Sequence, residues 1–359
     1  MFGALAILSS APSEAQVQLT DRARQTAQGG RVDLLEDGAL HVVLCGTGSP
    51  LPDRDRAGPC TAVLANGRFF VVDVGPGATE SIQLIGLPRG RLSALLLTHF
   101  HSDHIAELGE LVFSSWVGGR MQPLLVYGPE GVEQVVAGFQ QAYAFDAGYR
   151  TAHHGAEMMP PAAGRAEART IRLADSASEA SSAANPSNAS GTVLYDQDGL
   201  RVSAVAVDHR PIAPAVGYRF DFGGRCVVVS GDTVRSPALA AAAKGCDLLV
   251  HEVLSDTLVS AAARAMAGAG NARLGQMLTD TLDYHTFPAD VFALAAEAGV
   301  RVVVLTHLVP PVPAAQAEAV FTQGRDAFAG AVHVGVDGMH FTLPPDSREI
   351  VVSRPGPQP

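Results

Sequence analysis

Thr98-His99-Phe100-His101-Ser102-Asp103-His104 follows the apolar run of residues 92–97. That run is typical of a buried strand, so four metal-binding side chains stand directly after the strand ends. His99 and His101 are two apart and project to the same side of an extended backbone. Asp103 and His104 can face a second point once the chain turns, so the spacing indicates two neighbouring cations. The alternative is a polar turn with backbone-bonded histidines, and the full His-X-His-X-Asp-His pattern argues against it.

Three later residues close largely apolar runs and should therefore emerge at sheet edges: His209, Asp232 and His307. We expect His209 to join His99 and His101 around one cation. His307 would join Asp103 and His104 around the other, and the two oxygens of Asp232 can bridge the pair. Imidazole and carboxylate donors without thiolate suit two Zn²⁺ ions, with Mn²⁺ or Fe²⁺ as alternatives.

Such a site predicts hydrolysis without a side-chain nucleophile. Two adjacent cations lower the pKa of a shared water to near neutrality and clamp the reacting group, so a metal-bridged hydroxide would attack. Asp103 is the candidate to orient that hydroxide or accept its proton. His285, polarised by Glu252, could protonate the leaving group, although both residues could equally cap a strand and a helix.

The His-X-His-X-Asp-His motif resembles that of the metallo-β-lactamase superfamily of hydrolases. The resemblance covers roughly residues 41–345 and implies an α/β fold, a four-layer αβ/βα sandwich with a dinuclear site at the edge between two sheets. Further motifs look like the ribonuclease Z branch of the superfamily: Gly231-Asp232-Thr233, His251-Glu252, Tyr284-His285-Thr286 and Thr306-His307. In that branch the resemblance makes His251-Glu252 and His285 the elements that support the acid.

A finer resemblance points to the zinc-dependent arylsulfatase-like subgroup. It rests on Gly46-Thr47-Gly48-Ser49-Pro50 with Asp55-Arg56-Ala57-Gly58-Pro59, and on Val207-Asp208-His209-Arg210-Pro211 leading to Gly217-Tyr218-Arg219. Arg56 or Arg210 could recognise the substrate anion, or each could be an ordinary surface arginine.

The chain also departs from its relatives. A tRNA-processing member usually carries a basic, glycine-containing arm between the third-histidine motif and Gly-Asp-Thr, but here only the 22 residues 210–231 separate His209 from Asp232. Asp232 also occupies the position where a classical metallo-β-lactamase would place a thiolate.

The 359 residues divide into a leader (1–38), a single metallo-β-lactamase-fold domain (39–345) and a tail (346–359). Within the domain we expect two surface insertions. Residues 157–191 are rich in Ala, Ser, Pro and Glu and nearly low-complexity. Residues 255–284 are helical by propensity and could form a lid before His285.

Composition argues against polyanion partners. The net charge is −11 and Lys244 is the only lysine, so nucleic acid is not expected as a partner. No run reaches the roughly 18 apolar residues of a membrane span. The short apolar start, residues 1–8, could be part of a signal peptide. We expect a bacterial protein that is periplasmic or secreted in that case and cytoplasmic otherwise. A homodimer is considered, and the four cysteines neither demand nor exclude disulfides.

These observations favour a dinuclear metal-dependent hydrolase of small sulfuric or phosphoric esters, with an aryl sulfate as the leading candidate. The first alternative is a ribonuclease Z-type tRNA 3′ endonuclease or phosphodiesterase. The second is a lactonase or β-lactamase-like acyl hydrolase, because the same hydroxide attacks carbonyl carbon. A non-catalytic binding module should have lost at least one of the seven ligands, and all seven are present.

Overall fold

The strand before the metal-binding motif, β4 (Leu92–Leu96), is buried on both faces. Leu92 and Leu95 pack into one hydrophobic cluster, whereas Ala94 and Leu96 pack into another. A strand that is apolar on both faces needs a layer on each side, and this requirement sets the architecture around it.

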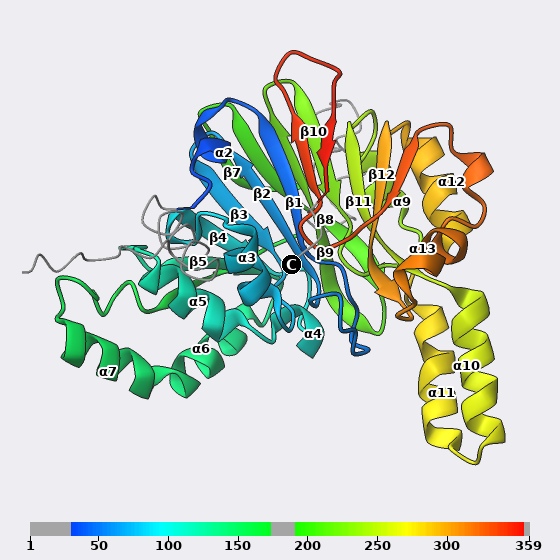
Figure 1. Cartoon of the computed structure of the whole chain (residues 1–359), viewed down its shortest axis with the longest axis horizontal. Coiled ribbons are helices and arrows are strands. Elements are labelled where there is room, and N and C mark those ends of the chain that lie inside the picture. The colour runs from blue at the N-terminus through cyan, green and yellow to red at the C-terminus, as the bar shows by residue number, and fades with distance from the viewer. Residues whose placement is uncertain (1–29, 174–190, 355–359) are drawn as a thin grey trace, which may run out of the picture.

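The computed structural model describes residues 30–173 and 191–354, in which two β-sheets pack face to face between layers of helices (Figure 1). The first sheet has the order β15 (Val351–Ser353), β14 (His340–Leu343), β1 (Leu40–Gly46), β2 (Cys60–Ala65), β3 (Arg68–Val72), β4, β5 (Leu124–Gly128), β6 (Ala166–Thr170). The second has the order β13 (Ala331–Val334), β12 (Val302–Val309), β11 (Leu248–Leu254), β10 (Arg225–Val229), β9 (Ile212–Phe222), β8 (Leu200–His209), β7 (Thr192–Gln197).

Helices cover the outer face of each sheet, which completes the four layers that the sequence predicts. On the first sheet these are α3 (Ala78–Ile85), α5 (Leu108–Val117) and α6 (Val132–Ala142). On the second they are α9 (Pro237–Ala242), α12 (Pro288–Ala298) and α13 (Ala314–Phe321). The inner faces of the two sheets share one further apolar core. The fold is therefore the predicted single-domain αβ/βα sandwich.

Two helical segments extend from this body. The helices α10 (Asp256–Gly268) and α11 (Ala272–Asp280) pack on each other as a hairpin that projects away from the sheets (Figure 1). This hairpin occupies the stretch 255–284 that precedes His285. On the other side of the molecule, α7 (Ala144–His154) follows α6 almost directly and buries none of its residues.

The structure adds detail to the expected boundaries. The short helix α2 (Asp33–Glu36) buries Leu34 and Leu35, so the core begins within the stretch assigned to the leader. Part of the predicted insertion 157–191 forms β6, which pairs in parallel with β5, and residues 174–190 lie outside the described residues. β15, in the assigned tail, pairs with β14. The candidate signal-peptide remnant at residues 1–8 also lies outside the described residues.

All four cysteines of the chain are paired. Cys45–Cys60 joins the end of β1 to the start of β2, and Cys226–Cys246 joins β10 to the residues just before β11. The sequence left this question open, because neither pair has a spacing that marks a disulfide.

None of the helices within residues 30–173 and 191–354 is both long enough and apolar enough to cross a lipid bilayer.

Candidate metal centre

The metal-binding motif lies where two sets of parallel strands end. After β4 the chain runs through His99 and His101 into the short helix α4 (Ser102–Ile105), which carries Asp103 and His104 (Figure 1). His209 is the last residue of β8, and Asp232 comes three residues after β10 ends. The two sheets thus bring these six side chains to one edge of the sandwich.

His307 reaches the same edge by a backbone irregularity. It lies within β12, but the register to β11 shifts there: Glu252 pairs with Thr306 and Val253 with Leu308. The bulged residue His307 has a φ of 46°, in the left-handed region that few non-glycine residues adopt. Bulges of this kind re-aim a side chain, and here the imidazole turns toward the motif.

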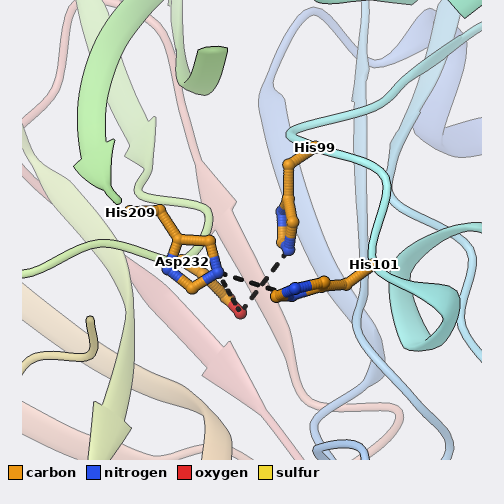
Figure 2. Close-up of side chains that lie close together, drawn as sticks. All are labelled: His99, His101, His209 and Asp232. Atoms are coloured by element: carbon orange, nitrogen blue, oxygen red, sulfur yellow. Dashed lines mark hydrogen bonds and ion pairs between the residues drawn. The ribbon is translucent and has the colours of Figure 1, made fainter. Parts of the chain in front are cut away.

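The first group consists of His99, His101, His209 and Asp232, whose donor atoms all lie within 4.8 Å of one another (Figure 2). The Nε2 atoms of His99 and His209 each lie 3.9 Å from Oδ2 of Asp232. Nδ1 of His101 lies 3.4 Å from Nε2 of His209. These are the residues that the sequence assigned to one cation.

The donor atoms of the second group lie close to the same oxygen of Asp232. Nε2 of His104 lies 3.3 Å from Asp232 Oδ2 and 3.4 Å from Asp103 Oδ2. Nε2 of His307 lies 3.4 Å and 3.3 Å from the same two oxygens. Asp232 Oδ2 therefore lies close to donor atoms of both groups, which is the position that a bridging residue would need.

Hydrogen bonds on the outer nitrogens orient three of these imidazoles. Nδ1 of His104 donates to Asp73 Oδ2 (2.8 Å), and Nδ1 of His209 donates to the carbonyl of Tyr284 (2.8 Å). Thr98 donates its hydroxyl to Asp73 (2.7 Å) and can thus accept from Nδ1 of His99 (3.0 Å). Each bond keeps a proton on Nδ1 and leaves the Nε2 lone pair facing the cluster.

Burial and charge favour the cation-binding forms of Asp232 and His99. Burial would raise the pKa of Asp232, but the facing His307 and His104 hold that pKa well below its ordinary value. Burial and the neighbouring His104 lower the pKa of His99 well below its usual range. An ionised carboxylate and a neutral imidazole are the forms that bind a metal ion. At His104 and His307 burial lowers the pKa, but the Asp232 carboxylate outweighs it and raises the pKa above the ordinary value, so cations here would displace protons from these two imidazoles.

The donor set fits divalent metal ions. The Nε2 atoms of His99 and His104 are buried and make no hydrogen bond to any described residue. Buried polar atoms without a partner are costly, and a cation at these points would satisfy them. Nitrogen and carboxylate oxygen donors match zinc, manganese or iron better than thiolate-selecting metals.

Glu252 and His285 lie beside the second group. One oxygen of Glu252, which is 1% exposed, accepts from the backbone amide of Thr286 (2.9 Å) and from Nδ1 of His285 (3.2 Å). A nitrogen of His285 lies within 4.8 Å of donor atoms of Asp232 and His307. The structure thus brings His285 to the cluster with Glu252 behind it.

The two arginines considered for substrate binding lie in different surroundings. Arg56 donates to the hydroxyl of Thr47 and to the carbonyl of Gly335, both at 2.6 Å, and its side chain is 7% exposed. Arg210 is exposed and pairs with Asp208. Arg56 is therefore engaged within the loop at the end of β1, whereas Arg210 is held by its near neighbour.

Sequence reasoning missed two orienting groups, Thr98 and the Tyr284 carbonyl. The threonine directly precedes the motif and could have been suspected. A backbone carbonyl 75 residues from His209 leaves no signal in the sequence.

Comparisons with known proteins agree with this geometry. The family described as the metallo-beta-lactamase superfamily matches residues 53–274. Ribonuclease Z from Mycobacterium marinum is 37% identical over 301 residues, which are 83% of this chain and 96% of that protein. Ribonuclease Z from Mycobacterium avium is equally similar, at 37% over the same lengths.

Solved structures share the fold. The metallo-beta-lactamase fold protein YhfI from Bacillus subtilis superposes with a TM-score of 0.58 at 18% identity, covering 85% of this chain and 99% of YhfI. The short form of human tRNase Z gives a TM-score of 0.57 at 20% identity with the same coverage.

These findings correct one expectation and shift another. The expectation of a small-molecule partner, with nucleic acid set aside, is wrong, because the close relatives carry the name of a ribonuclease. It relied on the net charge of the whole chain, which does not report on the surface around the site. The relatives also favour the ribonuclease alternative over the aryl sulfate interpretation.

Proposed function

Because this chain belongs to the ribonuclease Z-like branch of the metallo-β-lactamase superfamily, we propose that it is a metal-dependent endonuclease that hydrolyses RNA phosphodiesters, with the 3′ end of a tRNA precursor as its substrate. The observation that carries the proposal is the double ligand set around Asp232, which suits hydrolysis of a phosphodiester at two adjacent cations.

We assign His99, His101 and His209 to one cation, Asp103, His104 and His307 to the other, and Asp232 to both. Four Nε2 atoms lie 3.3–3.9 Å from Asp232 Oδ2 and support this assignment: those of His99, His104, His209 and His307. When bound, two cations would supply Lewis-acid stabilisation of the phosphate and lower the pKa of a water to near neutrality.

The protein's own groups would handle the protons. The Asp103 carboxylate lies beside His104 and His307. From there it would orient the attacking water or take its proton. His285 would donate a proton to the leaving ribose oxygen from the nitrogen opposite its bond to Glu252. Glu252 acts through His285 by fixing the direction in which the ring points.

The helical hairpin of α10 and α11 is the candidate contact for the body of the RNA. The chain has no room for an arm between His209 and Asp232, where β9 and β10 form a hairpin instead. The α10–α11 hairpin leads through residues 281–284 directly to His285. Because this projecting segment is joined directly to His285, the binding of a long RNA to the hairpin could affect the position of the proton donor.

The decisive assay offers zinc-loaded protein a tRNA precursor with a 3′ trailer. We expect a single cleavage near the 3′ end, and a fall in kcat of about 10²–10⁴-fold in His285→Ala with bound zinc unchanged. His153→Ala is the matched control. His153 lies in α7 away from the cluster, so this variant should cleave the precursor like the wild type.

Three p-nitrophenyl esters, the sulfate, the bis-phosphodiester and the acetate, test the other interpretations in the same preparation. Zinc-dependent sulfate turnover without precursor cleavage would overturn the proposal in favour of an arylsulfatase. Turnover of the acetate alone would replace it with an acyl hydrolase. Cleavage of the precursor that is equal in the wild type and His101→Ala would show a contaminating nuclease and would also overturn it.

A further inference from the structure

An apolar cavity of about 320 Å³ lies outside the metal centre, between α5, α6 and α7. Its walls include Val112 and Phe113 of α5, Phe139 and Gln140 of α6, Ala147 of α7, and Arg165. Ligand pockets in proteins typically occupy about 300–1,000 Å³, are mostly apolar and carry a few polar groups, so this cavity has the size and lining of a small binding site.

Helix α7 covers the cavity but packs only partly onto the body, through Ala147 and through Arg150, whose guanidinium lies over the Phe113 ring. None of its eleven residues is buried. Phe145 and Tyr149, which are four residues apart and stack on each other on one face of α7, are 76% and 67% exposed. A partly packed helix over an apolar space is stabilised by an apolar molecule that fills the space.

Arg165 supplies the one charged group of the lining. Its Nε donates to Gln140 Oε1 at 3.2 Å. Within residues 30–173 and 191–354, no carboxylate lies within ion-pair distance of its guanidinium. The remaining guanidinium N–H groups can therefore receive an anion, and a carboxylate matches their fork geometry.

The volume sets the size of the occupant. One non-hydrogen atom with its share of space takes about as much volume as a water molecule, ~30 Å³, so the cavity holds roughly ten such atoms. We infer that this cavity binds an apolar carboxylate of about that size, with its hydrocarbon part between α5, α6 and α7 and its carboxylate on Arg165. Octanoate, with eight carbons and two oxygens, is a suitable probe.

Trp116 provides the readout, because it is the only tryptophan of the chain and its ring packs edge-on against Phe113 at 5.6 Å. We expect octanoate to change its fluorescence saturably, with one site per chain by calorimetry and a dissociation constant below about 1 mM. 1-Octanol, which lacks the charge, should bind about tenfold more weakly, since a charge-assisted pair is worth on the order of a factor of ten.

Three variants distinguish binding in this cavity from non-specific hydrophobic binding. Arg165→Gln should weaken octanoate binding about tenfold, whereas Arg169→Gln should not, because Arg169 pairs with Glu167 outside the cavity. Ala147→Leu should abolish binding by filling the space while the unfolding midpoint stays the same or rises.

The inference is overturned if octanoate does not bind the wild type, if Ala147→Leu binds it equally well, or if the two arginine variants behave alike. None of these results bears on the ribonuclease activity, because the cavity shares no residue with the ligand groups around Asp232.

Discussion

Replacing Asp73 by asparagine is expected to weaken zinc binding about 10–100-fold without unfolding the protein. Asp73 is 4% exposed and accepts three hydrogen bonds: from the backbone amide of Thr98 (2.8 Å), from the Thr98 hydroxyl (2.7 Å) and from Nδ1 of His104 (2.8 Å). Its φ of 57° is left-handed, a conformation that asparagine tolerates, so the change isolates the loss of the carboxylate.

The magnitude follows from the bonds that asparagine can replace. Its carbonyl can still accept from the Thr98 amide, but its NH₂ would face Nδ1–H of His104, donor against donor. The imidazole can relieve this conflict by moving its proton to Nε2, the nitrogen that faces the cation. Binding would then have to restore the first tautomer, at a cost of about 1.4–2.8 kcal/mol for a 10–100-fold loss.

The assay is a zinc titration against a chromophoric chelator, beside urea unfolding of the metal-free protein. Replacing a charged hydrogen-bond acceptor by a neutral one should also lower the free energy of unfolding by about 1–3 kcal/mol. Asp198→Asn is the control, because Asp198 has a similar φ of 52° but lies exposed in the turn between β7 and β8. If Asp73→Asn bound zinc as tightly as the wild type, Asp73 would not orient His104.

Three further outcomes are expected. Replacing Cys45 and Cys60 by serine should lower the free energy of unfolding by about 3 kcal/mol, because the bond closes a loop of 15 residues; equal denaturant midpoints for variant and wild type would contradict this. Chelation of zinc should abolish hydrolysis and lower the melting temperature, since zinc at 100 times its dissociation constant stabilises the fold by about 2.7 kcal/mol. Differential scanning fluorimetry before and after zinc re-addition measures this, and an unchanged melting temperature would argue against bound metal. Glu252→Gln should lower kcat on the order of 10–100-fold with KM and zinc content unchanged, because it loosens His285; a normal kcat would remove Glu252 from the proton path.

Much of the site could be predicted because its residues terminate recognisable strands. His99 and His101 follow the apolar run of β4, and His209 ends β8, so the side-chain period of two and the strand ends were enough to place them. The position of His307 could not be predicted in the same way. It lies inside β12 at a bulge, and a sequence shows that a histidine follows an apolar run but not that the register shifts there.

Pairings between distant strands could not be predicted. His41 and His340 lie 299 residues apart, and their rings hydrogen-bond at 3.0 Å only because β1 pairs with β14. The disulfides also depend on strand order: Cys45 meets Cys60 only because β2 returns antiparallel beside β1. Local propensity carries no information on either contact.

The paired cysteines also affect how the protein would acquire metal. Zinc binds thiolate strongly, and a chain with four free thiols would offer unfolded or half-folded sites that compete with the imidazoles. Once both disulfides have formed, no cysteine of the chain remains free. Oxidation before metallation would therefore direct zinc to the histidines and aspartates around Asp232, so the order of these two maturation steps would determine the yield of correctly loaded enzyme.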